Sequence, residues 1–388
     1  MLNQYIHIQN TKSNLDIEDW RAKEFSNPNG LIRLGTTFSG IGAIEYALKR
    51  LGLNYRISFA GDIDADCKAS YFANYDIKED RWHSDIHDFD ATPFKNEIDL
   101  LVGGAPCQAF SMRGKRGGFE DTRGTLFREF ARVVMECKPK VFIFENVRGM
   151  INHDRGRTWK TIRETFERDC DYHVYFQILN GKDYGVPQSR ARLFCIGFLN
   201  ETDFKFPCPV PLNGRSMYDF LDKEFNKKYF LKHKGVHFVT EQINRDKSYT
   251  QINGDVMLCQ KRNQQFNWHG DFVYHPLLLS DTSTPDTDPT VFDSSFCETD
   301  YFTETELEKY PVIINGDTCE MISSSDINRY RGRFRKMTPI ECLRLMGFDD
   351  NFKIVVSDTA IYKQSGNSII VDVLMALLKQ MDITKYSI

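Results

Sequence analysis

The sequence lacks apolar runs long enough to span a membrane. It also lacks the basic and apolar opening of a signal peptide, because it begins with the polar stretch MLNQYIHIQN. Its ten cysteines are scattered singly, without a CxxC pair or a histidine cluster at ligand spacing, so neither a disulfide framework nor a metal site is predicted. These absences favour a cytoplasmic protein with reduced thiols, no membrane partner and no metal.

An excess of positive charge is also missing, since the formal net charge is −4. Basic residues are nevertheless concentrated in residues 113–128, 227–234 and 329–336, whereas residues 263–308 carry ten acidic residues and no Lys or Arg. Charge distribution matters more than the sum for binding a polyanion. The sequence therefore predicts a strongly polarised surface and leaves a nucleic-acid partner open.

The first half of the chain alternates short apolar runs with segments of helical periodicity. Strands are expected at residues 31–37, 56–60, 98–102, 141–144, 174–179 and 192–198, and helices at about 44–51, 65–75, 126–137 and 158–168. Alternation of this kind predicts an α/β fold with a Rossmann-like, doubly wound and mostly parallel sheet that is covered on both faces.

The alternation ends near Pro207. Residues 201–328 lack long helical periodicity and include the low-complexity run 280–289, which predicts a smaller, irregular second domain. We predict an N-terminal extension over residues 1–30 with a short helix near 17–25, a first domain over 31–200, and a segment over 329–388 that returns to it with a last helix at 369–381.

A glycine turn follows the first expected strand, in residues 38–42 (FSGIG). Such glycines serve plain turn chemistry or a cofactor site, because a helix N-terminus and a closely approaching backbone suit a nucleoside ligand. Asp62, at the end of the next strand, is placed to accept hydrogen bonds from ribose hydroxyls. The third glycine of the dinucleotide fingerprint is missing, which argues against a nicotinamide cofactor.

Cys107 and Glu145 each follow an expected strand and should lie at its carboxyl edge, where doubly wound folds bind ligands. There they would supply a nucleophile and a proton donor. A buried structural thiol and a solvated carboxylate are the alternative interpretations. Arg190 and Arg192 occupy alternate positions entering a strand and so share one face, and a surface salt bridge is their alternative.

Together these motifs resemble those of the DNA (cytosine-5) methyltransferase family of the bacterial restriction-modification type. Six matching segments occur in the family's order: residues 38–42, 104–111, 145–147, 188–192, 335–348 and 366–368. The resemblance covers residues 31–200 and 329–381. It departs from the family in Asp62, where Glu is common, in Asp349, where Pro is usual, and in the first thirty residues.

The resemblance implies methyl transfer from S-adenosylmethionine to C5 of a flipped-out cytosine in double-stranded DNA. Cys107 would add to C6, Glu145 would hydrogen-bond or protonate N3, and Arg192 would hold the O2 side, with Arg190 as the fourth catalytic residue. The implied cofactor residues are Phe38, Gly40, Gly42, Asp62, Ile63, Asp85, Ile86, Pro106, Leu126, Asn367 and Ser368. The implied DNA contacts are Gln108, Ser111, Arg113, Lys115, Arg116, Arg123, Arg331 and Arg333, with residues 111–122 as the loop that closes over DNA.

Residues 201–328 take the place of the target-recognition domain by the same resemblance. Arg245, Gln251, Asn253 and Arg262 are candidates for base contacts there, or simply parts of a polar surface. The implied partners are double-stranded DNA and a restriction endonuclease acting on the same site, and the chain is expected to be a monomer.

Three alternative functions are compatible with parts of the sequence. A tRNA cytosine-5 methyltransferase shares the motifs, although the match over residues 114–127 favours DNA. A catalytically silent subunit would have lost Cys107, Glu145 or Arg192, and all three are present. Adenine or N4-cytosine methylation is disfavoured because the chain contains no Asp-Pro-Pro-Tyr or Asn-Pro-Pro-Tyr motif.

Overall fold

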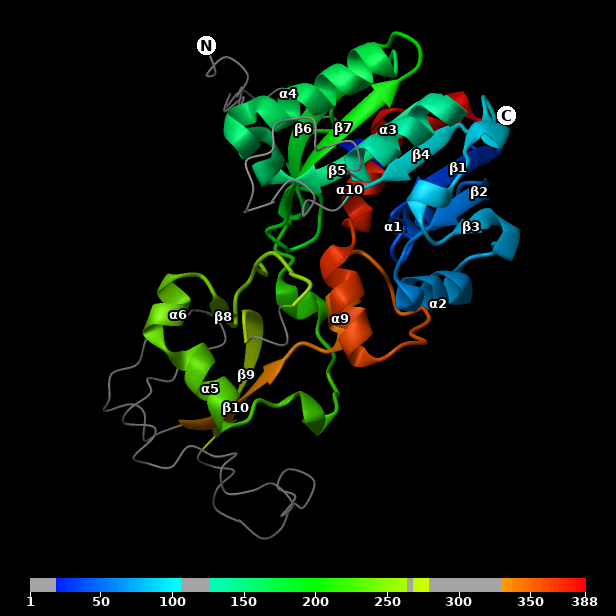
Figure 1. Cartoon of the computed structure of the whole chain (residues 1–388). Helices are drawn as coiled ribbons and strands as arrows, with labels where there is room; N and C mark the ends of the chain where they lie inside the picture. Colours follow the sequence, from blue (N-terminus) through cyan, green and yellow to red (C-terminus); the bar gives the residue numbers. More distant parts are fainter. Residues whose placement is uncertain (1–18, 106–125, 264–267, 279–329) are drawn as a thin grey trace.

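The computed structural model describes residues 19–105, 126–263, 268–278 and 330–388. A seven-stranded sheet forms the centre of the larger domain (Figure 1), with the strand order β3-β2-β1-β4-β5-β7-β6. Its strands are β1 (Ile32–Thr37), β2 (Tyr55–Gly61), β3 (Trp82–His83), β4 (Leu100–Gly103), β5 (Val141–Val147), β6 (His173–Asn180) and β7 (Ala191–Phe198).

Strands β1 to β5 pair in parallel, whereas β7 runs antiparallel to both β5 and β6. The predicted α/β fold with a mostly parallel, doubly wound sheet is therefore confirmed.

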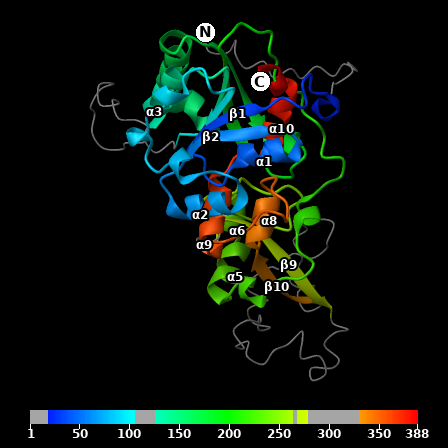
Figure 2. The ribbon, with the colours of Figure 1, turned by 90° about the vertical axis from the view of Figure 1, so that its right-hand side faces the viewer.

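Apolar side chains cover both faces of this sheet. Along β5, Val141 and Ile143 belong to one buried cluster, and Phe142 and Phe144 to another. Helices α1 (Ala43–Arg50) and α10 (Val371–Gln380) contribute to the first cluster, and α3 (Leu126–Cys137) and α4 (Arg157–Glu164) to the second. Figure 2 shows α3 on one side of the strands and α1 and α10 on the other. The continuous apolar runs that predicted these strands reflect burial on two faces.

Two predicted helices differ in detail from the observed ones. The predicted second helix is α2 (Ala65–Asn74), which starts where the side chain of Asp64 accepts a hydrogen bond from the backbone N of Asp66. The helix predicted over residues 158–168 is divided into α4 and a π-helical turn, Thr165–Asp169. Short 3-10 turns connect the larger elements, and they are Glu79–Arg81, Ile86–Asp88, Thr92–Phe94, Arg148–Gly156, Gly181–Asp183, Met217–Phe220, Lys227–Tyr229 and Ile383–Tyr386.

A second, three-stranded sheet lies below the first in Figure 1, with the order β10-β9-β8. Its strands are β8 (Thr250–Ile252), β9 (Gly270–Leu278) and β10 (Tyr330–Lys336), and it is accompanied by α5 (His233–Thr240) and α6 (Gln242–Asp246). Because β10 pairs antiparallel with β9, the first residues of the predicted returning segment still belong to the second sheet. Strand partners this distant cannot be read from one sequence, so the boundary placed at 328/329 falls before a strand of the smaller sheet.

After β10 the chain returns to the larger domain through α8 (Pro339–Arg344), α9 (Asp358–Asn367) and α10. Helix α9, which the sequence analysis did not predict, lies between the two sheets in Figure 1. Its sequence, DTAIYKQSGN, mixes polar and apolar residues without a clear apolar face, which explains why periodicity missed it.

The described end of the N-terminal extension packs against the end of the chain. The predicted helix near residues 17–25 is only a short 3-10 turn, Trp20–Ala22, with Trp20 buried. Leu31 and Ile388 exchange two backbone hydrogen bonds, and the backbone N of Asn27 donates to Thr384 Oγ1. In the part of the chain described here, no helix has the length and apolar character needed to cross a membrane.

Candidate active site

The turn between β1 and α1 has an unusual backbone. Phe38, Gly40 and Gly42 have φ angles of 53°, 56° and 78°, all in the left-handed region. This conformation is strained for Phe38, and such strain is concentrated at functional sites. Gly42 is constrained a second time, because a Cβ there would lie 2.3 Å from the ring of Tyr75. The backbone of the predicted cofactor turn is therefore held in one conformation by its left-handed φ angles and by the close packing of Tyr75 on Gly42.

Asp62 faces this turn from the end of β2. Its Oδ2 accepts a hydrogen bond from the backbone N of Gly40 at 2.9 Å, and its Oδ1 accepts one from Asp64 at 2.9 Å. Burial raises the pKa of the Asp62 carboxyl, and these backbone donors oppose the rise. The next side chain, Ile63, is 80% exposed. A carboxylate beside an open apolar side chain fits a nucleoside, since ribose hydroxyls can donate to one and a base can pack on the other.

The other predicted cofactor residues come from three separate segments. Asp85, just after β3, accepts hydrogen bonds from the backbone N of His87 at 3.0 Å and from its ring Nδ1 at 2.7 Å. These contacts lower the pKa of Asp85 and raise the pKa of His87. The remaining described members are the buried Ile86, Leu126 at the start of α3, and Asn367 and Ser368 at the end of α9. Their roles toward a cofactor stay predictions.

Glu145 and Arg192 form an ion pair between β5 and β7. Glu145 Oε1 lies 3.2 Å from Arg192 Nε, and the two side chains are only 13% and 16% exposed. The sequence placed Glu145 just after a strand that ends at Phe144, but β5 continues to Val147 because it pairs with β7 along its whole length. A charged residue inside a strand interrupts the apolar run, and this shortened the predicted strand.

The reversed direction of β7 brings these two residues together. Arg192 lies near the beginning of its strand and is paired with Val147, at the end of β5. In a parallel strand, a residue near the beginning would lie at the amino edge of the sheet, away from the carboxyl end of β5. The antiparallel strand therefore places the arginine motif at the edge where β4 and β5 end.

Burial is the main cause that raises the pKa of the Glu145 carboxyl, while the charges of Arg192 and Arg190 oppose the rise. A buried carboxyl group whose pKa is raised by desolvation is suited to donating a hydrogen bond or a proton, and the two guanidinium groups limit that rise. The pair therefore has the electrostatic character expected of an acid catalyst.

Arg190 differs in role from Arg192. It is 3% exposed and donates hydrogen bonds to the backbone oxygens of Gln260 at 2.6 Å, Ser368 at 2.7 Å and Gly366 at 3.0 Å. Burial, followed by repulsion from Arg192, lowers the pKa of Arg190 to about 10. Its guanidinium thus joins the arginine motif, the second domain and the predicted final cofactor turn. Neither arginine is a freely solvated surface residue.

Gly104 and Ala105 are the last described residues before the predicted nucleophile. A Cβ on Gly104 would lie 3.0 Å from Glu145 Oε2, and Asn146 Nδ2 donates to the backbone oxygen of Ala105 at 3.0 Å. The chain that leads to Cys107 therefore passes directly beside Glu145. Outside the described residues lie Pro106, Cys107, Gln108, Ser111, Arg113, Lys115, Arg116 and Arg123, and only the backbone of Arg331 and Arg333 is described.

Two of the polar candidates for base contacts form hydrogen bonds to backbone groups of the second domain. Gln251 Nε2 donates to the oxygen of Val256 at 2.8 Å, and Asn253 Oδ1 accepts from the backbone N of Tyr274 at 2.8 Å. These contacts stabilise the β8–β9 region and give both side chains a structural role. Arg262 is exposed.

One further residue at this site, Cys259, was not predicted from the sequence. Its Sγ lies 3.7 Å from Arg190 Nη1 and 3.6 Å from Arg192 Nη2. Cysteine spacing carried no signal for it, because the partners are 67 and 69 residues away in the chain.

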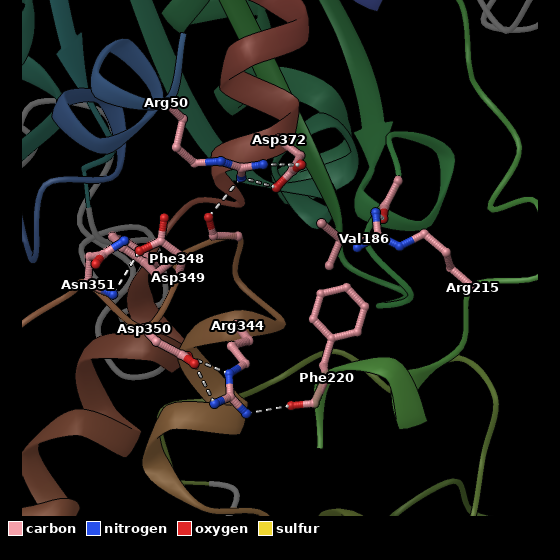
Figure 3. A pocket seen from close by; sticks show the side chains of 12 residues that line it. Arg50, Val186, Arg215, Phe220, Arg344, Phe348, Asp349, Asp350, Asn351 and Asp372 are labelled. Carbon is pink, nitrogen blue, oxygen red and sulfur yellow. Dashed lines mark hydrogen bonds and ion pairs between the residues drawn. The ribbon is translucent and has the colours of Figure 1, made fainter. Parts of the chain in front are cut away.

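A cavity of about 490 Å³ lies apart from the Glu145–Arg192 pair (Figure 3). It is lined by residues of α1, of α10, of 344–351 and of the 185–220 part of the chain, and by none of the predicted site residues. Two of its three arginines form ion pairs, Arg50 with Asp372 and Arg344 with both Asp222 and Asp350, and Arg215 donates to the backbone oxygen of Gly185. Asp349, a departure from the family pattern, accepts hydrogen bonds from Tyr46 and from the backbone N of Asn351. The cavity wall therefore fastens the returning segment to the larger domain. Across the described ranges, no group of three or more His, Cys, Asp or Glu side chains could hold a metal ion.

The sheet order with its reversed seventh strand, together with the site at the carboxyl edge, defines a Rossmann-like methyltransferase. The family model of C-5 cytosine-specific DNA methylases matches residues 32–382, so the chain belongs to this family. It is a DNA cytosine-5 methyltransferase.

Similar proteins align over nearly their full length. The orphan methyltransferase M.SPRI of Bacillus phage SPR is 30% identical, over 91% of this chain and 98% of the relative. The type II methyltransferase M.HpaII of Haemophilus parainfluenzae is 34% identical over 92% and 91%, and M.HhaI of Haemophilus parahaemolyticus is 30% identical over 88% and 92%.

Solved structures share the fold at lower identity. The Dnmt2 methyltransferase of S. pombe superposes with a TM-score of 0.60 and 20% identity, over 90% of this chain and 97% of that chain. A DNMT2 mutant of Spodoptera frugiperda gives 0.62 and 18%, over 90% and 99%. At this identity the likeness shows the fold alone.

Proposed function

We propose that this protein transfers a methyl group from S-adenosylmethionine to C5 of a flipped-out cytosine in a specific double-stranded DNA sequence, through a covalent adduct between Cys107 and C6. The observation that carries the proposal is the buried Glu145–Arg192 pair beside the chain that leads to Cys107. An acid and a cation at one sheet edge match the two polar sides of a cytosine ring, N3 and O2.

The base chemistry assigns one step to each residue. The Cys107 thiolate adds to C6, while Glu145 donates a hydrogen bond or a proton to N3, so that C5 becomes nucleophilic. Arg192 donates to O2 and offsets the negative charge that develops on the ring. C5 then accepts the methyl group, which leaves S-adenosylhomocysteine as the second product. Loss of the C5 proton to water, return of the N3 proton to Glu145 and cleavage of the Cys107–C6 bond regenerate the thiolate and release the methylated base.

S-adenosylmethionine, when bound, supplies the electrophilic methyl group. The 38–42 turn would approach it through the backbone, Asp62 would accept from its ribose hydroxyls, and Ile63 would pack on its adenine. Ser368, whose backbone oxygen Arg190 holds, would help to close the pocket from the returning segment. Arg190 acts in this proposal as a positioning residue, because its described contacts are to backbone oxygens.

We further propose that residues 201–328 read the DNA sequence and that the basic residues on either side of the nucleophile and along β10 bind phosphates. We propose that the acidic stretch 281–308, which lies outside the described residues, faces away from DNA, since its charge would oppose binding to phosphates. The protein acts as a monomer and as the modification enzyme that protects DNA from a restriction endonuclease of the same specificity. The type II relatives support this pairing, whereas the phage relative is an orphan.

Bisulfite sequencing of plasmid DNA from a host that expresses this chain tests the activity and finds the target. We expect methylated cytosines in one sequence context, and Cys107→Ser should reduce them to background. The wild-type protein should also form a covalent complex with a duplex that carries 5-fluorocytosine at that site.

Unmethylated plasmid together with newly methylated tRNA would contradict the DNA assignment and favour the tRNA alternative. Absence of a trapped complex on a duplex that the enzyme otherwise methylates would contradict the role of Cys107. Resistance of the methylated plasmid to one restriction endonuclease would identify the site that the proposed partner shares.

A further inference from the structure

Residues 257–262 cross from the second domain onto the arginine motif, and we refer to them as the 257–262 segment. We propose that Cys259 in this segment is a positioning residue, whose Sγ holds the Arg192 guanidinium beside Glu145 and so orients it toward the target base. This inference rests on the proposed role of Arg192.

Each nitrogen of the Arg192 guanidinium has its own contact in the structure. Nε faces Glu145 Oε1 at 3.2 Å, Nη1 donates to the backbone oxygen of Ala191 at 3.0 Å, and Nη2 donates to Cys259 Sγ at 3.6 Å. Glu145 and Ala191 hold one side of the planar group, and the sulfur is the described contact of Nη2. A thiol is a weak acceptor, but a charged donor strengthens the bond.

The sulfur is also shared with the second arginine. Arg190 Nη1 lies 3.7 Å from Sγ, and the same nitrogen donates to the backbone oxygen of Gln260. The Cys259 thiol can in turn donate to that oxygen, at 3.7 Å. The two guanidinium groups, which repel each other, are thus separated and set by one side chain.

The backbone around Cys259 is fixed to the arginine motif. Ser189 N donates to the oxygen of Met257 at 2.8 Å, and Met257 N donates to the oxygen of Pro187 at 2.8 Å. On the other side, Gln260 N donates to Gln188 Oε1 at 3.1 Å. Because the backbone is anchored on both sides of Cys259, the Cβ atom that carries the sulfur has a defined position.

Two further contacts hold the segment from opposite sides. Both carboxyl oxygens of Asp271, a fully buried residue of β9, lie 3.1 Å from the backbone N of Leu258. At the other end, a Cβ on Gly366 would lie 2.5 Å from the backbone of Lys261 and Arg262. The segment therefore links a strand of the recognition region to Arg192, and Cys259 is the side chain through which the link reaches the site.

The test compares Cys259→Ala and Cys259→Ser with Cys208→Ala, an exposed cysteine that serves as the matched control. Steady-state methylation of the duplex found by bisulfite sequencing is measured with the full-length protein. We expect Cys259→Ala to lower kcat about tenfold, the effect of one lost hydrogen bond to a charged group, with KM for S-adenosylmethionine within about twofold. Cys259→Ser should recover most of kcat, because its hydroxyl also accepts, and Cys208→Ala should match the wild type.

Arg192→Lys, measured in parallel, separates this inference from the proposed function. If Arg192→Lys lowers kcat and Cys259→Ala does not, Cys259 does not position Arg192. If Cys259→Ala and Cys259→Ser lose kcat equally and both melt at lower temperature, the role of Cys259 is structural and the inference is overturned. If Arg192→Lys keeps the wild-type kcat, the proposed role of Arg192 fails first.

Discussion

At the scale of single residues, two buried carboxyl groups of the larger domain have different surroundings. Glu145 is desolvated beside two guanidinium groups, whereas Glu45, in the first turn of α1, is fully buried among hydroxyl groups. Glu45 Oε1 accepts from Tyr71 and from Thr36, and Glu45 Oε2 has no hydrogen-bond partner. The surroundings of Glu145 suit proton donation to a bound base, whereas those of Glu45 make the stability of the fold depend on pH.

Glu145→Gln tests the acid at the proposed site. The amide keeps the shape and can donate a hydrogen bond, but it cannot deliver a proton. We expect the single-turnover methylation rate to fall about 10²- to 10⁴-fold. Binding of S-adenosylhomocysteine should change by less than about twofold, because the predicted cofactor residues of the 38–42 turn and Asp62 lie at the ends of β1 and β2, apart from Glu145 on β5. A rate near the wild-type value would remove Glu145 from the reaction.

Glu45→Gln tests the pH dependence of stability. Burial raises the pKa of Glu45 from 4.5 to about 7 in the folded protein. The folded state therefore binds the proton more tightly than the unfolded state, and the stability that this group contributes at low pH is lost as the pH rises through this interval. The loss amounts to about 3 kcal/mol in the free energy of unfolding.

Urea denaturation of wild type and variant between pH 4.5 and 8 measures this effect. The wild type should lose stability relative to Glu45→Gln up to about pH 7 and no further above it. Asp271, whose pKa burial also raises to about 7, contributes equally to both proteins and cancels in the comparison. Parallel curves for the two proteins would show that Glu45 does not titrate in this range.

At the scale of elements, the sequence predicted six of the seven strands of the large sheet, but not β3, the strands of the second sheet or the direction of β7. The apolar runs at residues 141–144 and 192–198 are equally compatible with parallel and antiparallel pairing. The direction of a strand depends on the segment that connects it to the strand before. The π-helical turn before β6 and the 3-10 turn before β7 leave no sequence pattern as clear as an apolar run. The shared edge of Glu145 and Arg192 therefore came from family resemblance, and the structure supplies its physical cause.

The 257–262 segment was not predicted, for a related reason. Its contacts are mostly backbone hydrogen bonds and a sulfur, and neither leaves a residue pattern in one sequence. Arg190 and Arg192 were found as a pair, but their division into a backbone-binding and an acid-binding residue required the structure.

Gly366→Ala tests the packing of this segment on residues 366–368, the predicted final cofactor turn. An added Cβ would lie 2.5 Å from the backbone of Lys261 and Arg262. Backbone atoms cannot relieve the overlap by a change of rotamer, as a side chain could. We expect a loss of about 1–3 kcal/mol in stability. We also expect weaker binding of S-adenosylhomocysteine, because Ser368 is displaced with the turn. Calorimetry and thermal unfolding measure both.

Gly149→Ala is the matched control, since a Cβ at Gly149 meets no atom within 4 Å and its backbone is not left-handed. It should leave both stability and binding near the wild-type values. Equal behaviour of the two variants would contradict the close approach at Gly366.

At the scale of the whole molecule, the sequence predicted two structural units and the return of the chain to the first. The predicted division near residue 200 follows the last strand of the large sheet, which ends at Phe198. It could not place β10, since pairing with β9 is a contact between segments more than fifty residues apart. It also missed that residues 19–31 pack on the chain's last residues, because an isolated aromatic such as Trp20 has no periodic partner.

The order of the elements along the chain has a consequence for synthesis. All seven strands of the large sheet lie before residue 199, whereas α10, which packs on α1 over one face, lies at Val371–Gln380. As the chain leaves the ribosome, the sheet is complete while Ile44, Leu48 and their neighbours still lack their covering helix. Residues 201–328 must be made before that apolar face is closed. Folding of the larger domain, which is synthesised first, is therefore completed only by α10, which is synthesised near the end. A nascent chain stalled between β7 and α10 would expose an apolar surface to which chaperones can bind.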